Sequence, residues 1–317
     1  MREQPQVSIE KPPTGEGEKQ RRPTTALRKL RRKLSRTALR LPVIWYRHHG
    51  FRPEDVFFVS YPRSGTTWTR HTLFELLTGE KSGFRVVDST LCVVGKHHGG
   101  KAVLPGAGRL IATHEQYRDW KHYHKAIYLV RDVRDVVLSE FVYLRNLEFF
   151  YGDQDKFVKH FLTTPVSGFG PWQRHVSSWL DSPIAATPNF LLVRFEELKR
   201  DPVAGVTRMA KFLGLSPSPD LIQRAVANNS LAKMQEKEQR EPVKASVKGR
   251  FVGAGLAEGW RSKLSPAQVR LIEQYAGPAL VRLGYSLSTT PPRETASPIT
   301  DLRESPETGL KQQEQQC

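Results

Sequence analysis

The stretch DVFFVSYPRSGTTW at residues 55–68 contains an apolar run, a tight turn and the beginning of a helix. Its first part, residues 55–60, is rich in Val and Phe and predicts a short buried strand that ends before Pro62. One glycine, Gly65, then precedes hydroxyl residues, and a helical pattern continues through Leu77. The stretch therefore predicts a strand, a glycine-containing turn and a helix in direct succession.

Three further apolar runs predict strands at residues 109–113, 126–130 and 189–194. Helical patterns follow the last two, at residues 135–144 and in the segment that ends at Gly214. The runs do not alternate between apolar and polar residues, which is typical of strands buried on both faces of a parallel sheet. We therefore predict an α/β fold with three layers, in which a parallel sheet is flanked by helices.

Residues 62–68 have the chemistry of an anion-binding loop. The first N–H groups of a helix lack partners within the helix and carry partial positive charge, which favours phosphate or sulfate. Gly65 lets the backbone approach closely, Arg63 adds a charged donor fork, and Thr66 and Thr67 add hydroxyl donors. The alternative is the cap of a purely structural helix. The loop lacks the Gly-Lys-Ser/Thr ending of a Walker A motif, which argues against a kinase or ATPase.

His114 is the candidate general base among the ten histidines. It directly follows the predicted strand at residues 109–113, so it should emerge at the carboxyl edge of the sheet, where parallel α/β sheets bind ligands. The loop with Arg63 and the strand before Arg131 end at the same predicted edge. A neutral imidazole suits proton abstraction near pH 7. The alternative is a loop histidine whose ring is satisfied by the backbone.

The net charge of +17 is concentrated in one segment. Twelve Lys or Arg residues and no Asp or Glu lie between Lys19 and Arg52, and without these twelve the net charge falls to +5. That value is ordinary for an enzyme with an anionic substrate, so we expect no nucleic-acid partner. Only two cysteines occur, no run reaches the roughly 18 apolar residues of a membrane span, and the first twenty residues are polar. These features predict a cytoplasmic protein without structural disulfides.

The composition divides the chain into four parts. Residues 1–24 and 287–317 are rich in Pro, Glu and Gln and predict disordered tails. Residues 25–49 form a basic amphipathic leader, and residues 50–286 form the catalytic domain. The leucines of residues 25–41 fall at nearly helical spacing between basic residues. We favour a basic helix on the domain edge, and the alternative is peripheral contact with an anionic membrane surface.

Two segments of the chain resemble the sulfotransferases that use 3′-phosphoadenosine-5′-phosphosulfate (PAPS). YPRSGTTW at residues 61–68 is similar to the family's loop for the 5′-phosphosulfate, although members usually have Lys in place of Arg63. YLVRDVRDVVLS at residues 128–139 is similar to its 3′-phosphate segment. The similarity extends over about residues 50–285. It implies a P-loop-like nucleotide-binding sulfotransferase fold with PAPS as co-substrate and no metal.

The resemblance implies a role for individual residues. Arg131 and Ser139 would hold the 3′-phosphate, and His114 matches the family's catalytic histidine. Arg63 and the N–H groups of residues 64–68 would stabilise the sulfuryl group and the leaving phosphate during an in-line displacement. The cofactor-binding residues that the resemblance implies are Arg63, Ser64, Gly65, Thr66, Thr67, Trp68, Arg131, Ser139, Phe195 and Ser230. Lys248 and Arg250 are added as cofactor-binding candidates that could replace basic residues of the family pattern.

The chain departs from the family pattern at four places. Ala112 stands where many members have Lys, and Phe195 replaces a Tyr that contacts the cofactor. Leu231 occupies the place of an aromatic residue that stacks on adenine, and residues 253–255 replace an Arg-Lys-Gly triplet. Lys248 and Arg250 lie near enough in sequence to compensate. Each lost hydrogen bond would weaken cofactor binding by roughly 1–3 kcal/mol.

Two alternatives to a sulfotransferase are open at this point. A P-loop-like nucleotide kinase would share the phosphate-binding loop, and a non-catalytic protein would bind anionic surfaces through its leader. The acceptor is a small molecule of unknown identity that receives the sulfuryl group on a hydroxyl or an amine, and the oligomeric state is unknown. An aromatic cluster favours an apolar or planar acceptor, although such residues more often belong to the core; it comprises Phe141, Tyr143, Phe149, Phe150 and Tyr151.

Overall fold

The computed structural model describes residues 41–121, 123–147, 149–150, 152–164, 169–241 and 250–288. The chain divides into two units, Met1–His49 and Gly50–Cys317. In the first unit, helix α2 (Leu41–His48) carries an exposed Trp45 whose ring stacks on that of His49. The predicted tails, apart from residues 287–288, and the leader up to residue 40 lie outside the described residues, as does Lys248.

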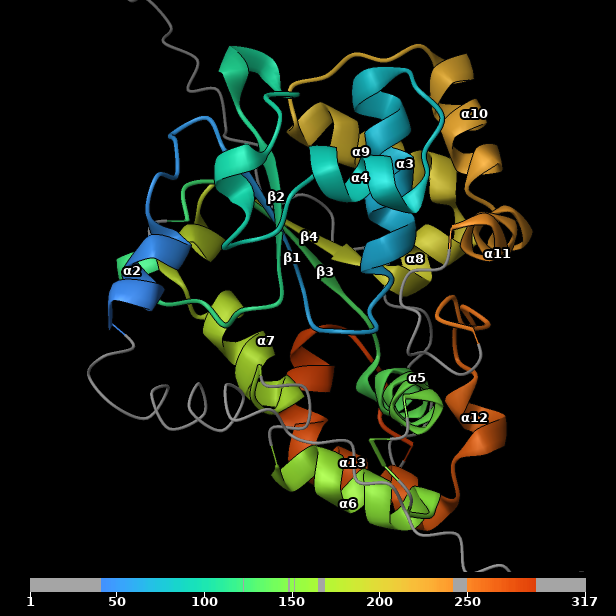
Figure 1. Ribbon diagram of the computed structural model, residues 1–317. Coiled ribbons are helices and arrows are strands. Elements are labelled where there is room, and N and C mark those ends of the chain that lie inside the picture. The colour runs from blue at the N-terminus through green and yellow to red at the C-terminus, as the bar shows by residue number, and fades with distance from the viewer. Residues whose placement is uncertain are drawn as a thin grey trace, which may run out of the picture. The chain divides into compact units, whose positions relative to one another are not determined.

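The second unit contains a parallel four-stranded sheet of order β2-β1-β3-β4 (Figure 1). The strands are β1 (Val56–Ser60), β2 (Leu110–Thr113), β3 (Ala126–Val130) and β4 (Phe190–Arg194). Each lies within one residue of the predicted run. All residues of β1, β2 and β3 are buried, because helices cover both faces of the sheet.

Two separate hydrophobic cores lie against the two faces of the sheet. Side chains alternate along each strand, so Phe57 and Val59 belong to one core and Val56 and Phe58 to the other. The first core contains residues of α5 (Val133–Asn146), α6 (Gln154–Thr163), α7 (Trp172–Leu180), α12 (Trp260–Lys263) and α13 (Pro266–Arg282). The second contains residues of α3 (Thr66–Thr78), α4 (Phe84–Thr90), α8 (Phe195–Arg200), α9 (Pro202–Phe212) and α10 (Pro219–Asn228). This arrangement confirms the predicted three-layer fold (Figure 1).

The remaining elements connect these layers. Helix α11 (Leu231–Arg240) follows α10, and short 3₁₀ turns occur at His97–Gly99, Pro105–Ala107, Asp119–Lys121 and Pro183–Ala186. Among the described residues no helix has the length and apolar character needed to cross a bilayer.

The carboxyl ends of the four strands bring distant residues to one edge of the sheet. Ser60 ends β1 ahead of the Arg63 loop, and His114 follows β2 directly. Arg131 follows β3, and Phe195 follows β4 and begins α8. Because all strands are parallel, these four connections meet at the same edge.

A buried ion pair joins the beginnings of β1 and β2. Arg109 Nη2 lies 2.5 Å from Asp55 Oδ2, and Arg109 Nε donates to Asp55 Oδ1 over 3.0 Å. The same guanidinium donates to the carbonyl oxygens of His97 and Gly50. The strand predicted at residues 109–113 begins at Leu110, because the backbone N–H of Arg109 donates to Asp55 Oδ1 over 3.0 Å and not to a neighbouring strand.

The Asp55→Ala substitution should lower the free energy of unfolding by about 3–5 kcal/mol, because it leaves the Arg109 charge buried without its carboxylate. The matched control is Glu197→Ala, which removes an exposed ion pair with Arg208 and should cost less than about 1 kcal/mol. Denaturant unfolding of both variants measures the difference. Equal, small losses would show that the buried pair does not stabilise the sheet.

Candidate active site

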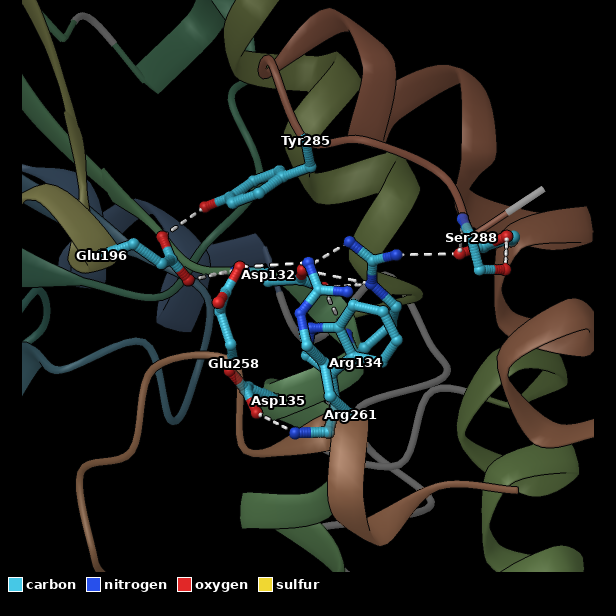
Figure 2. A network of polar contacts seen from close by, with 10 residues as sticks. Asp132, Arg134, Asp135, Glu196, Glu258, Arg261, Tyr285 and Ser288 are labelled. Atoms are coloured by element: carbon cyan, nitrogen blue, oxygen red, sulfur yellow. Dashed lines mark hydrogen bonds and ion pairs between the residues drawn. The ribbon is translucent and has the colours of Figure 1, made fainter. Parts of the chain in front are cut away.

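Helix α5 is positioned by the buried polar network of Figure 2. Arg134 Nη2 lies 2.6 Å from Asp132 Oδ2, and Arg134 Nη1 lies 2.8 Å from Glu273 Oε1 of α13. The backbone N–H of Asp132 donates to Glu196 of α8, which also accepts a hydrogen bond from the hydroxyl of Tyr285. The beginning of α5 is therefore joined to α8, to α13 and to the segment after α13.

The loop between β1 and α3 has a strained backbone and lies close to α8. Gly65 has a φ of 100°, and a Cβ there would lie 2.6 Å from the ring of Phe195. Arg63 also has a positive φ, of 66°, which is uncommon for a residue with a side chain. Gly65 occupies the N-cap position of α3, which has no side-chain cap. The first N–H groups of α3 are therefore available to an anion.

The guanidinium of Arg63 is held by neutral groups. Nε donates to Ser139 Oγ over 3.1 Å, and Nη2 donates to the carbonyl oxygen of Phe251 over 3.2 Å. The charge lies over the rings of Tyr143 and Phe251, at 4.7 and 5.3 Å from their centroids. Burial lowers the pKa of Arg63 from its ordinary value. The structure thus brings Arg63 and Ser139 together, although the family resemblance assigns them to different ends of the cofactor.

Arg131 hydrogen-bonds to the loop between β1 and α3 and stabilises it. Nη1 donates to the carbonyl oxygen of Arg63 and Nη2 to that of Leu256, each over 2.8 Å. Its guanidinium lies 4.6 Å from the centroid of the Phe195 ring. Among the described residues, the buried Nε of Arg131 has no hydrogen-bond partner. Burial lowers the pKa of Arg131, and the nearby carboxylates of Asp135 and Glu196 oppose this effect.

The hydrogen bond of His114 defines its tautomer. Nδ1 lies 2.7 Å from the carbonyl oxygen of Ser60. A carbonyl can only accept, so Nδ1 carries the proton in the neutral ring and Nε2 keeps its lone pair. Burial lowers the pKa of His114, and the positive charges of Arg70 and Arg63 lower it further. The ring is therefore neutral at pH 7, with Nε2 able to accept a proton.

These residues line one cavity of about 810 Å³. One group of lining residues comes from α8, α10 and α11 and includes Phe195, Ser230 and Leu231. A second, largely apolar group comprises Tyr143, Leu144 and Leu147 of helix α5 and its following turn, together with Phe149 and Phe169. His114, Arg63 and Ser139 also line the cavity. The cavity therefore combines cationic and hydroxyl groups with an apolar wall.

Ten of the sequence-predicted residues line this cavity, and two described ones, Ser64 and Arg250, do not. Those that line it are Arg63, Gly65, Thr66, Thr67, Trp68, His114, Arg131, Ser139, Phe195 and Ser230. The side chain of Ser64 is fully buried beneath the loop and is not among the lining residues. Arg250 is exposed and does not line the cavity, so it does not replace the missing triplet there. Lys248 lies outside the described residues.

Sequence reasoning assigned no role to Glu140, which lines the cavity beside Ser139. The signal in the sequence was the helical spacing: Tyr143, Leu144 and Leu147 follow Glu140 by three, four and seven residues, which places all four on one face of a helix. Within the aromatic cluster, Tyr143 and Phe149 line the cavity. Phe141 and Phe150 belong to or pack against the core, and Tyr151 lies outside the described residues.

A family model described as Sulfotransferase domain matches residues 106–284. Sulfotransferase 1 family member D1 of Mus musculus is 26% identical over 247 residues, which cover 70% of this chain and 82% of that protein. Sulfotransferase 2A1 of Homo sapiens is 26% identical over 235 residues, which cover 68% of this chain and 81% of that protein.

Solved structures have the same fold. A mouse sulfotransferase complexed with PAP is 23% identical, with a TM-score of 0.57 over 75% of this chain and 92% of the other. A retinol dehydratase in complex with androsterone and PAP is 21% identical, with a TM-score of 0.60 over 79% of this chain and 85% of the other. The family model covers more than half of the sequence, and the chain therefore belongs to the family of sulfotransferases, enzymes that transfer a sulfuryl group from PAPS.

Proposed function

We propose that the cavity binds PAPS with its 5′-phosphosulfate at residues 62–68 and its 3′-phosphate at Arg131 and Ser139. Four features support this placement: the uncapped beginning of α3, the close approach allowed by Gly65, the unpartnered Nε of Arg131, and the neutral partners of Arg63. Arg109 and Arg134 are paired with carboxylates, whereas Arg63 and Arg131 form no ion pair within 4.0 Å among the described residues. Their charge is therefore available to an anion.

His114 acts as the general base in this proposal. The acceptor hydroxyl gives its proton to Nε2 as the acceptor oxygen forms a bond to sulfur and the bond from sulfur to the phosphate oxygen breaks. The product nucleotide leaves as 3′-phosphoadenosine-5′-phosphate (PAP). Arg63 and the N–H groups of the loop stabilise the charge that develops on the leaving phosphate. The observation that carries this proposal is the bond from His114 Nδ1 to Ser60, which leaves Nε2 as a proton acceptor in the cavity with Arg63.

The departures from the family pattern are compatible with this chemistry. Ala112 lies buried within β2 and supplies no charge. Arg70 of α3 and Arg63 both act electrostatically on His114, so positive charge lies near the ring without the missing lysine. Phe195 offers no hydroxyl, but its ring lies under the guanidinium of Arg131.

We assign the reaction to a catalytic domain at residues 50–286 and place the enzyme in the cytoplasm. The family match at residues 106–284 supports the first assignment, and the low cysteine content supports the second. The apolar wall of Tyr143, Leu147 and Phe169 supports an acceptor with an apolar body and a hydroxyl group.

Calorimetric titration with PAP should show binding that requires the 3′-phosphate, so ADP should bind far more weakly. Ser139→Ala should weaken PAP binding about 10- to 100-fold, because it removes a hydrogen bond to a charged group. The control Ser262→Ala changes an exposed serine of α12 and should leave the affinity unchanged. Equal binding of PAP and ADP would contradict the proposed cofactor.

His114→Gln should lower kcat by about 10²- to 10⁴-fold while PAP affinity is retained, because only proton transfer is removed. The control His160→Gln changes an exposed histidine of α6 and should be without effect. Initial-rate assays with a phenol or alcohol acceptor, together with PAP titration, measure both quantities. Full activity of His114→Gln would exclude His114 as the base.

The pH profile of kcat/KM should fall on the acid side below pH 6.5, the ordinary pKa of histidine, because burial lowers the pKa of His114 and the base works only when neutral. Burial also raises the pKa of Asp135 to about 6, so this carboxylate is a second source of such a limb. The limb should persist in Asp135→Asn and disappear in His114→Gln. Loss of the limb in Asp135→Asn would assign it to the carboxylate.

A further inference from the structure

Glu140 is a buried carboxylate in the cavity that the proposed chemistry does not use. It is 3% exposed and lines the cavity, and its Oε2 is buried without a hydrogen-bond partner among the described residues. A buried carboxylate without a partner is costly. The proposed reaction needs positive charge around the phosphosulfate. A negative side chain in the same cavity does not serve that reaction, so Glu140 should have a different role.

The position of Glu140 on α5 places it with the apolar wall. Tyr143, Leu144 and Leu147 follow it at intervals of three, four and seven residues, and all three also line the cavity. Residues at these intervals share one face of a helix. Ser139 and Tyr143, which are four residues apart, contact Arg63 at the edge of that face. Glu140 is thus a carboxylate on the helix face that forms the apolar wall of the cavity.

Arg63 does not neutralise Glu140 by a direct contact. The donors Nε and Nη2 of Arg63 bond to Ser139 and Phe251, and no ion pair involving Glu140 is found in the described part of the chain. Burial raises the pKa of Glu140, and the charge of Arg63 opposes this effect without contact. Oε2 therefore still lacks a donor. A donor that arrives with the ligand would satisfy it.

We propose that Glu140 binds a cationic amine of the acceptor, and that the natural acceptor is a hydroxylated amine with an apolar body. This inference rests on the proposed function, because His114 would receive the hydroxyl at the same time. An ammonium group supplies N–H donors and a positive charge, which offsets the cost of burying the carboxylate. The apolar wall would hold the carbon skeleton between the two polar ends.

The test compares acceptors that differ only in the amine. Calorimetric titrations use tyramine against 4-ethylphenol, and 6-amino-1-hexanol against 1-hexanol, with the enzyme alone and saturated with PAP. In at least one pair the amine should bind about 10- to 100-fold more tightly to the wild type, because it makes a hydrogen bond to a charged group. Glu140→Gln should abolish this preference, and Glu140→Asp should retain part of it.

Two controls separate recognition from loss of fold. Glu80→Gln removes an exposed carboxylate after α3 and should keep the amine preference. Glu140→Gln should unfold at the same temperature as the wild type or higher, because it removes an unpaired buried charge. Its affinity for PAP should be unchanged or increased, because a negative charge leaves the cavity.

The outcomes distinguish this inference from the proposed function. Failure of PAP to bind would overturn the cofactor assignment, while the amine preference is still measured with the enzyme alone. Binding of PAP without an amine preference in either pair, or a preference that survives in Glu140→Gln, would overturn the role of Glu140 in recognition. If Glu140→Gln lowers kcat equally for amine and neutral acceptors and leaves their binding unchanged, Glu140 is a proton acceptor. That result would also overturn its role in amine recognition.

Discussion

The buried charge of Arg134 is the constraint on which the active-site geometry depends. Its side chain is 2% exposed and bonds to Asp132 and Glu273, and its guanidinium carbon lies 3.9 Å from the centroid of the Trp260 ring. A buried charge of this kind is tolerated only when all its partners are in place, so α5, α12 and α13 must assemble together. Glu273 also accepts hydrogen bonds from the N–H and hydroxyl of Ser288, which extends the network to the end of the described chain.

This network also fixes the position of the cavity residues, because several of them lie on α5 or directly before it. Arg131 immediately precedes Asp132, and Ser139 and Glu140 follow about two turns into the helix. The contact of Asp132 with Glu196 sets the beginning of α5 against α8, whose first residue, Phe195, lies beneath both Gly65 and Arg131. The loop between β1 and α3 and the helix that carries the apolar wall are thus held in place relative to each other by contacts outside the cavity.

Two kinds of arginine coexist in this fold. Arg109 and Arg134 are neutralised by carboxylates and hold elements together. Arg63 and Arg131 instead donate to carbonyl oxygens and a hydroxyl, groups that satisfy N–H donors without cancelling the charge. The two arginines of the cavity are therefore held in place without a ligand while their positive potential is preserved. The same reasoning makes Glu140 conspicuous, since it alone brings an unpaired carboxylate oxygen to this cavity among the described residues.

Much of the fold could be predicted because its signals are local. The four apolar runs became β1 to β4 with boundaries that differ by at most one residue, since a buried strand requires a continuous apolar run. Helix α5 begins two residues before the predicted position because the side chain of Asp132 accepts a hydrogen bond from the N–H of Arg134 and caps it. Ser64 shows the limit of motif-based prediction, since its hydroxyl is buried under a loop whose other members face the cavity.

The sequence by itself determined the strands, the glycine-containing loop between β1 and α3, and the appearance of His114 at the end of a strand, because each depends on residues adjacent in the chain. Only the tertiary structure decided the tautomer of His114, the pairing of Arg63 with Ser139 and the network of Arg134. In each of these contacts the partners are far apart in the chain. His114 and Ser60 are 54 residues apart, Arg63 and Ser139 are 76 apart, and Arg134 and Glu273 are 139 apart. No local pattern specifies which distant group meets a given side chain, because that choice is made when the two hydrophobic cores close on the sheet.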